Sequence, residues 1–357
     1  MIETPPKRFL SNRRGSSPQE VLDVLAVAAR NEDAFDQYGS GAIVEGLERV
    51  VAALLGKQAA VFCTSGRVAQ LSALRSHAER RGRFVVAAHP RSHIVEDEDD
   101  AIGTLFGLRV ARTGTLTDPF TLAELEAVHD PLAAVVVELP LRRCGFRVPA
   151  FSDLVALAEH AHKSGAAFHL DGARLWETAP GYGRSLTEIA ALADTVYVSF
   201  YKGLGGLAGA ALAGDAKTIA AARTWIGRAG ATLYRMYPYA LAAREGLRTE
   251  LPRMPLYHAR AVELAAALRD VPGVAVSADP PACNAFAVYV DGRADALLAA
   301  RDAIADARGI VLFEGLRPTP HPQVSFFEIT VGPNTLELGV ADVRDAFMEL
   351  AVRATSR

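Results

Sequence analysis

The sequence predicts an α/β protein, with a large domain built on a mostly parallel sheet flanked by helices and a smaller C-terminal α+β domain. Three observations lead to this prediction. Short runs are apolar at successive positions, as in strands that are covered on both faces. Amphipathic, helix-like segments lie between these runs. The pattern then changes near Pro255, which predicts a large domain over 1–255 and a small domain over 256–357.

The composition is that of an ordinary globular protein, with 50% hydrophobic and 22% charged residues in a chain of 357. The formal net charge of -3 gives no general attraction to phosphate backbones or anionic lipids, so we expect neither nucleic acid nor a membrane as a partner. No apolar secretory signal is visible at the N-terminus, which favours a cytoplasmic protein. The three cysteines are far apart and lack metal-ligand spacing, so we expect neither a disulfide framework nor a metal site.

The elements of the large domain follow from local patterns. Ser17-Pro18-Gln19-Glu20 has the form of a capping box with proline in the first turn, which predicts the start of a helix. Residues 41–56 repeat apolar positions at helical spacing and end on a glycine, which predicts a second helix. Six apolar runs and two amphipathic stretches follow, and they predict strands at 59–63, 83–88, 133–139, 166–170, 195–200 and 208–213 and helices at 121–129 and 152–164.

In the small domain, some segments have apolar residues at helical spacing and others have strand-like apolar runs, but strands and helices do not alternate regularly. The same criteria predict helices at 256–270, 294–307 and 340–353 and strands at 274–278, 284–290, 309–314 and 323–331.

Residues able to do chemistry gather at the predicted strand ends, which is where open α/β sheets bind their ligands. Asp171 follows the run at 166–170, and Lys202 follows the run at 195–200 within a glycine-rich segment. The turn CTSGRVAQ, residues 63–70, leads from a strand into a helix, and Glu138 ends the run at 133–139.

Each of these groups has an ordinary interpretation by itself. Asp171 could cap a helix, Lys202 could be a solvated lysine, and Ser65-Gly66-Arg67 could be a simple turn. The functional interpretations are sharper: a helix N-terminus with an arginine binds anions, and a buried lysine forms a Schiff base with a carbonyl. An amine, a carboxylate opposite a pyridine nitrogen and an anion site are together the three anchors that pyridoxal phosphate requires.

The segments HLDGARLWE (169–177), SFYKGLGGLAGA (199–210) and CTSGRVAQ (63–70) resemble the threonine aldolase group of the β-eliminating lyases, which are fold-type-I pyridoxal-phosphate enzymes. The resemblance implies that fold, pyridoxal 5'-phosphate as cofactor, and cleavage of a threonine-like 3-hydroxy-α-amino acid to glycine and an aldehyde. It also implies a homodimer or homotetramer. Two alternatives stay open: another pyridoxal-phosphate-dependent lyase or glycyl-transfer reaction on a related β-substituted amino acid, and a non-catalytic protein that retains the fold.

The resemblance also implies roles for single residues. Lys202 corresponds to the Schiff-base lysine and Asp171 to the partner of the pyridine nitrogen. His93 corresponds to a histidine that stacks on the cofactor ring, and Glu98 to an acid near the substrate hydroxyl, so these two are the candidates for the catalytic base. The other implied contacts are Ser65, Gly66 and Arg67 to the cofactor phosphate, Arg174 to the phenolic oxygen and the substrate carboxylate, Ser11 to that carboxylate, and Arg235 to a phosphate across a subunit boundary.

The chain departs from the family at two places. Where the family has Glu-Asn-Thr-His-Asn, residues 138–143 read ELPLRR, so Leu141 replaces the histidine that contacts the β-hydroxyl of threonine. In the C-terminal domain, Glu328 lies near the place of a carboxylate-binding arginine. Because a partly buried carboxylate is best bound by a bidentate cation, we expect Arg142 or Arg143 to supply one.

Overall fold

The computed structural model describes residues 7–11, 17–30, 32 and 35–355, which form two compact units. The larger unit spans 17–253, and the smaller one combines the chain from Met254 onward with the described residues of the N-terminal segment. This corrects the prediction that the N-terminal segment belongs to the large domain. Its β1 (Arg8–Phe9) pairs in parallel with β11 (Ile310–Val311), a partner so distant in sequence that no local pattern predicts it.

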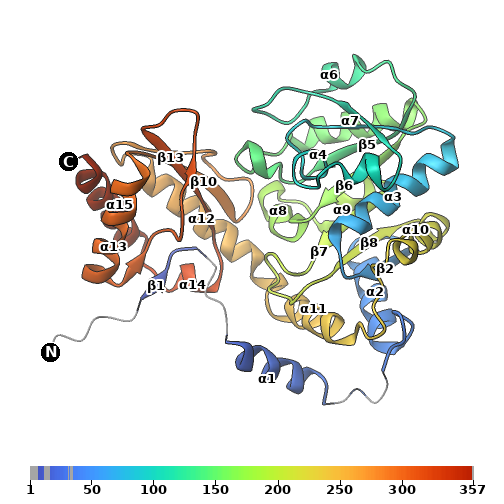
Figure 1. The fold of residues 1–357 in the computed structure, drawn as a ribbon, viewed down its shortest axis with the longest axis horizontal. Helices are drawn as coiled ribbons and strands as arrows, with labels where there is room; N and C mark the ends of the chain where they lie inside the picture. Colours follow the sequence, from blue (N-terminus) through green and yellow to red (C-terminus); the bar gives the residue numbers. More distant parts are fainter. Residues whose placement is uncertain (1–6, 12–16, 31, 33–34, 356–357) are drawn as a thin grey trace. The chain divides into compact units, whose positions relative to one another are not determined.

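The large unit is built on a seven-stranded sheet with the order β2-β8-β7-β6-β5-β3-β4 (Figure 1). Strands β7, β6, β5, β3 and β4 run parallel, while β8 is antiparallel to both of its neighbours. The predicted mostly parallel sheet is therefore confirmed. Its strands are β2 (Ala59–Cys63), β3 (Val85–Ala88), β4 (Arg109–Arg112), β5 (Leu132–Glu138), β6 (Ala167–Gly172), β7 (Thr195–Ser199) and β8 (Ala210–Gly214).

Strand β4 is the one strand of this sheet that the sequence analysis missed. It reads Arg-Val-Ala-Arg, and both arginines are exposed. Because β4 lies at the edge of the sheet and pairs only with β3, it does not need the continuous apolar run of the central strands, and charged residues at an edge oppose further pairing.

Helices flank the sheet (Figure 1). The capping box predicted at Ser17 is present, with Ser17 and Glu20 each bonded to the backbone of the other. The helices of the large unit are α1 (Pro18–Ala28), α2 (Ala42–Leu54), α3 (Gly66–Arg81), α4 (His93–Glu96), α5 (Ala101–Thr104), α6 (Leu122–Glu126), α7 (Phe151–Lys163), α8 (Leu175–Tyr182), α9 (Leu186–Ala191), α10 (Ala216–Arg228) and α11 (Tyr237–Thr249), with 3-10 turns at Arg142–Cys144 and Leu251–Arg253.

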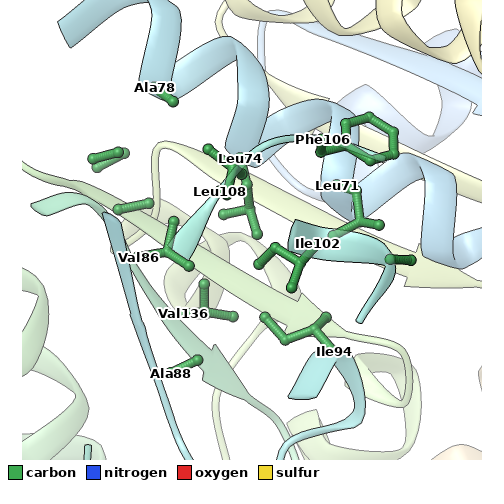
Figure 2. Close-up of a cluster of buried hydrophobic side chains, with 14 residues drawn as sticks. Leu71, Leu74, Ala78, Val86, Ala88, Ile94, Ile102, Phe106, Leu108 and Val136 are labelled. Carbon is green, nitrogen blue, oxygen red and sulfur yellow. The ribbon is translucent and has the colours of Figure 1, made fainter. Parts of the chain in front are cut away.

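Helix α3 is fixed on the sheet by an apolar cluster (Figure 2). Leu71 and Leu74 of α3 pack with Val86 of β3 and Val136 of β5, and all four are buried. Burying one side chain of this size contributes about 1.5–3 kcal/mol. The cluster thereby holds the N-terminus of α3 at the end of β2, beside the ends of the central strands.

The small unit has a four-stranded antiparallel sheet with the order β12-β13-β10-β9. The strand predicted at 309–314 is only the two residues of β11, and β12 was not predicted. Its elements, besides β1 and β11, are α12 (Met254–Leu268), β9 (Val274–Val276), β10 (Ala285–Asp291), α13 (Ala294–Arg308), β12 (Arg317–Pro318), β13 (Val324–Thr330), α14 (Pro333–Leu336) and α15 (Val340–Thr355).

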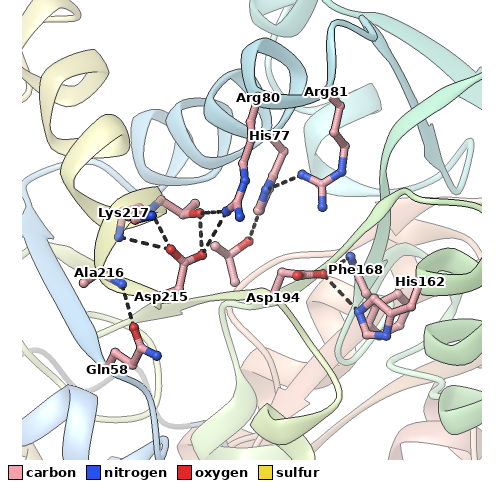
Figure 3. A network of polar contacts seen from close by, with 12 residues as sticks. Gln58, His77, Arg80, Arg81, His162, Phe168, Asp194, Asp215, Ala216 and Lys217 are labelled. Carbon is pink, nitrogen blue, oxygen red and sulfur yellow. Dashed lines mark hydrogen bonds and ion pairs between the residues drawn. The ribbon is translucent and has the colours of Figure 1, made fainter.

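A buried hydrogen-bond chain links α3 with the start of β7, and Figure 3 shows its first two members, Arg81 and His77. Arg81 lies 3.2 Å from Nδ1 of His77, Nε2 of His77 lies 2.9 Å from Oγ1 of Thr195, and that oxygen lies 2.8 Å from Nδ1 of His169. Since the guanidinium only donates, His77 accepts at Nδ1 and donates to Thr195, which donates in turn to His169. Both histidines are neutral in this arrangement.

This chain predicts loss of stability in acid. Burial lowers the pKa of His77 to about 4 and that of His169 to about 3, from 6.5. Below pH 6.5 the unfolded chain therefore binds protons that the folded chain does not, so the free energy of unfolding falls between pH 6.5 and pH 4, by on the order of 3 kcal/mol for each histidine. Urea unfolding at pH 7, 5.5 and 4.5 measures this.

A His169→Asn variant, which can keep an acceptor near Nδ1 but does not titrate, should lose less stability across this range than the native chain. His129, which is exposed and lies outside this hydrogen-bond chain, is the control, and its change to Asn should leave the pH dependence unchanged. Equal free energies of unfolding at pH 7 and 4.5 for the native chain would contradict the prediction.

Candidate active site

A cavity of about 210 Å³ lies beyond the carboxyl ends of β5, β6 and β7, entirely within the large unit. It brings together seven of the residues that the sequence analysis selected. These are Arg67, His93, Arg142, Arg143, Asp171, Arg174 and Lys202. Residues far apart in the sequence therefore converge on one space of the size of a small ligand.

Lys202 follows β7 in the turn that leads toward β8. Burial is the main cause that lowers the pKa of its amine, and the neighbouring Arg174 lowers it further. The charge of Asp171 opposes both effects. Lys202 is thus an amine that gives up its proton more readily than a solvated lysine, as covalent attachment to a carbonyl requires.

Asp171 ends β6 and is only 2% exposed. Its Oδ1 accepts a hydrogen bond of 3.1 Å from the backbone of Ala173, which orients the carboxylate. In the sheet it lies opposite Glu138 of β5 and Tyr197 of β7. A carboxylate in such a position is available to a cationic group bound in the cavity.

His93 lines the cavity, and its Nδ1 lies 3.0 Å from Oε1 of Glu98, which is not itself a lining residue. Although Glu98 belongs to the acidic run at 96–100, it is 1% exposed, and burial raises its pKa. The hydrogen bond to Glu98 in turn raises the pKa of His93. When Nδ1 of a neutral His93 donates to Glu98, Nε2 is left as the basic atom.

Glu138 organises this wall, a role that the sequence analysis did not assign to it. Its Oε2 accepts from the backbone N–H of His93 at 2.7 Å, and its Oε1 accepts from that of Arg142 at 3.2 Å. Burial, together with the charge of Asp171, raises the pKa of Glu138 to about 7. One carboxyl group therefore fixes two cavity residues from different segments of the chain.

The arginines of the cavity differ in their partners. Arg143 donates to both carboxylate oxygens of Asp97 and lies 3.1 Å from Glu96. The guanidinium of Arg174 lies over the ring of Phe146, at 5.5 Å from its centroid. Arg143 is consequently held by acidic side chains of the protein itself.

The predicted phosphate turn has the expected form. Ser65 caps α3 by accepting a hydrogen bond from the backbone of Val68. A side-chain carbon at Gly66 would lie 2.0 Å from the hydroxyl oxygen of Tyr197, so only glycine fits there. Arg67 is a lining residue of the cavity, whereas Ser65 and Gly66 are not among its lining residues.

Within the large unit, Arg235 is not among the residues that line the cavity. Arg235 donates to the backbone oxygen of Asp36 and lies between the rings of Phe35 and Tyr234, so within this chain it reaches no cavity residue. Ser11 belongs to the small unit, where its hydroxyl accepts a hydrogen bond from the backbone of Thr330 at 3.2 Å. The roles of both stay predictions.

The cavity also has lining residues that the sequence analysis did not name, among them Gln70, Tyr197 and Tyr201. Tyr201 directly precedes Lys202, so its position in the motif could have found it. Gln70 and Tyr197 carry no such signal, since they look like ordinary residues of a helix and a strand.

In the described part of the chain, no group of three or more histidine, cysteine or acidic side chains is placed to hold a metal ion. None of the helices in the same residues combines the length and apolar character that crossing a bilayer needs.

The chain is similar to known proteins over most of its length. The family model described as beta-eliminating lyase matches residues 16–292. A crystal structure from Listeria monocytogenes, solved as a candidate L-allo-threonine aldolase, is 37% identical, covers 98% of this chain and 96% of its own, and has a TM-score of 0.91. Low-specificity L-threonine aldolase 1 of Arabidopsis thaliana is 26% identical over 74% of this chain and 76% of its own length.

A third relative, an aldolase of Penicillium aethiopicum, is 30% identical over 225 residues. These residues are 61% of this chain but only 56% of the relative.

Proposed function

The chain belongs to the β-eliminating lyase family and is a pyridoxal-phosphate-dependent lyase, and on this premise we propose that it is an aldolase that cleaves a 3-hydroxy-α-amino acid to glycine and an aldehyde. The observation that carries the proposal is the convergence of Lys202, Asp171 and His93 on one cavity, with Glu98 hydrogen-bonded to His93.

The donor set of the cavity fits pyridoxal phosphate. Lys202 offers a buried amine, and Asp171 a buried carboxylate for the ring nitrogen. The N-terminus of α3, with Arg67, offers backbone N–H groups and a cation for the phosphate. When bound, the cofactor supplies an electron sink for the negative charge that develops at the substrate Cα.

The side chains of the cavity would then divide the proton chemistry. Nε2 of His93, set by the bond from Nδ1 to Glu98, takes the proton from the β-hydroxyl oxygen as the Cα–Cβ bond breaks and the aldehyde leaves. Lys202 would return a proton to Cα, which completes glycine. The carboxylate of Asp171 would hold the proton on the ring nitrogen.

The assignment of His93 is supported by the surroundings of Leu141, which stands where the family has a histidine. Leu141 is buried and lines a small apolar space with His89 and Phe120, not the cavity. Since this position offers no polar atom to the β-hydroxyl, the proton of that hydroxyl needs another acceptor, and His93 is a cavity residue suited to the task.

For the substrate carboxylate we propose Arg174 with Arg142 or Arg143 as the second cation, since all three arginines line the cavity. The guanidinium of Arg143 is bonded to Asp97 and lies close to Glu96. Arg142 lines the cavity, and the bond from its backbone to Glu138 fixes its place on the wall.

The proposal is tested by assaying the cofactor-loaded protein with threonine, allo-threonine, phenylserine and a β-chloro amino acid. We expect glycine and the matching aldehyde from at least one of the three hydroxy amino acids, measured by coupled aldehyde reduction. Pyruvate and chloride from the β-chloro compound, with no aldehyde from the others, would instead identify a β-eliminating enzyme.

The same assay separates the two arginines through the variants Arg142→Lys and Arg143→Lys. The variant of the arginine that binds the carboxylate should raise KM for the accepted substrate by about tenfold with little change in kcat, because a bidentate contact that serves ground and transition states alike is lost. The other variant is the matched control and should change KM much less. A native KM in both variants would exclude both arginines from this role.

A further inference from the structure

Glu177 ends the segment HLDGARLWE and has no part in the proposed chemistry. It lies in the first turn of α8 and is 1% exposed. An acidic residue is seldom so fully buried without a defined partner, because removing a carboxylate from water is costly. The surroundings of Glu177 therefore need an explanation.

One partner of Glu177 is the turn that carries Lys202. Its Oε1 accepts a hydrogen bond of 2.9 Å from the backbone N–H of Gly203, the residue directly after the lysine. A side-chain carbon at Gly203 would lie only 2.3 Å from the same oxygen. The turn thus closes tightly on the carboxylate, which accounts for glycine at this position.

Glu177 also interacts with two nearby positive charges, those of Arg174 and Lys202. Oε2 of Glu177 has no hydrogen-bond partner among the described residues and is buried. Burial raises the pKa of Glu177, and the positive charges of Arg174 and Lys202 oppose this. Glu177 in turn affects Lys202. Its negative charge, like those of Asp171 and Glu138, raises the pKa of the lysine and so opposes the effect of burial.

We propose that Glu177 is a positioning residue for Lys202: its carboxylate fixes the backbone directly after the lysine and supplies a negative charge that acts on the lysine nitrogen. The inference rests on the proposed role of Lys202 as the residue that binds the cofactor. It differs from a packing role, which the neighbouring Trp176 fulfils by filling the core and donating to the backbone oxygen of Ser199.

Two substitutions separate the two parts of this role. Glu177→Gln keeps a carbonyl oxygen for the N–H of Gly203 but removes the charge, whereas Glu177→Leu removes both. The readouts are the pH midpoint of the visible absorbance of the cofactor-loaded protein and the rate at which cofactor is lost on dilution. Glu188→Gln, on the exposed surface of α9, is the matched control.

We expect Glu177→Gln to lower the absorbance midpoint by about one pH unit, since a nearby negative charge favours the protonated lysine nitrogen. Cofactor loss should stay close to that of the native protein. Glu177→Leu should share this shift and also lose cofactor about tenfold faster. If Glu177→Leu fails to fold, Gly203→Ala replaces it, because the added carbon displaces the carboxylate.

Native midpoints and native cofactor retention in these variants would overturn the inference and leave the proposed function intact. Cofactor that remains covalently attached to the Lys202→Ala variant after borohydride reduction would overturn the assignment of Lys202 itself. The two failures are therefore distinguishable.

Discussion

Lys202→Ala is expected to abolish the covalent attachment of the cofactor and to lower turnover at least about a thousand-fold. The substitution removes the buried amine and, with it, the group placed to return a proton to the substrate Cα. The cavity and Asp171 remain, so cofactor can still bind without a covalent bond. Borohydride reduction followed by mass spectrometry measures the attachment, and the aldehyde assay measures turnover.

Lys163→Ala is the control for this experiment, since Lys163 is exposed in the last turn of α7 and has no cavity contact. It should keep both the attachment and the turnover of the native protein. Cofactor attached to a peptide that lacks residue 202 would show that another lysine is the reacting one.

Asp171→Asn is expected to leave cofactor bound and to lower kcat by about a thousand-fold. Asparagine can keep the oxygen that accepts from Ala173, so the end of β6 should hold its form. It carries no charge, however, and cannot keep the ring nitrogen protonated, which weakens the electron sink that the chemistry needs. Cofactor content by absorbance and kcat at saturating substrate measure the two effects separately.

Asp153→Asn on the exposed face of α7 removes one negative charge from the same unit without touching the cavity, and it should behave as the native protein. Turnover in Asp171→Asn within a few-fold of the native value would contradict the electrostatic role of Asp171.

Much of the large unit follows from local sequence. The runs at 59–63 and 133–139 are continuous in apolar residues because their strands are covered on both faces, and this pattern predicts buried strands at once. β4 was not predicted because an edge strand does not need a continuous run of apolar residues. The N-terminal β1 escaped because its pairing with β11 is decided far along the chain.

The candidate site divides in the same way. Asp171 and Lys202 follow central strands, and strand ends on the same edge of a parallel sheet meet, so their convergence was predictable. The resemblance named Glu98 as an acid near the substrate, but neither its hydrogen bond to His93 nor the role of Glu138 was predicted from the sequence. Glu98 belongs to the acidic run at 96–100, whose composition is typical of a solvent-exposed segment. Only the tertiary structure buries it beside His93.

The sequence by itself determined the buried central strands, the helix cap at Ser17 and the residues at the strand ends, because these depend on the period of apolar side chains and on neighbours within a few positions. Only the tertiary structure decided which of the charged residues are buried and what each one holds. Glu138 binding two separate loops and Glu177 meeting Gly203 depend on the strand order and on helix placement. Strand order and helix placement depend on contacts between residues that are distant in the sequence, so no short segment predicts them.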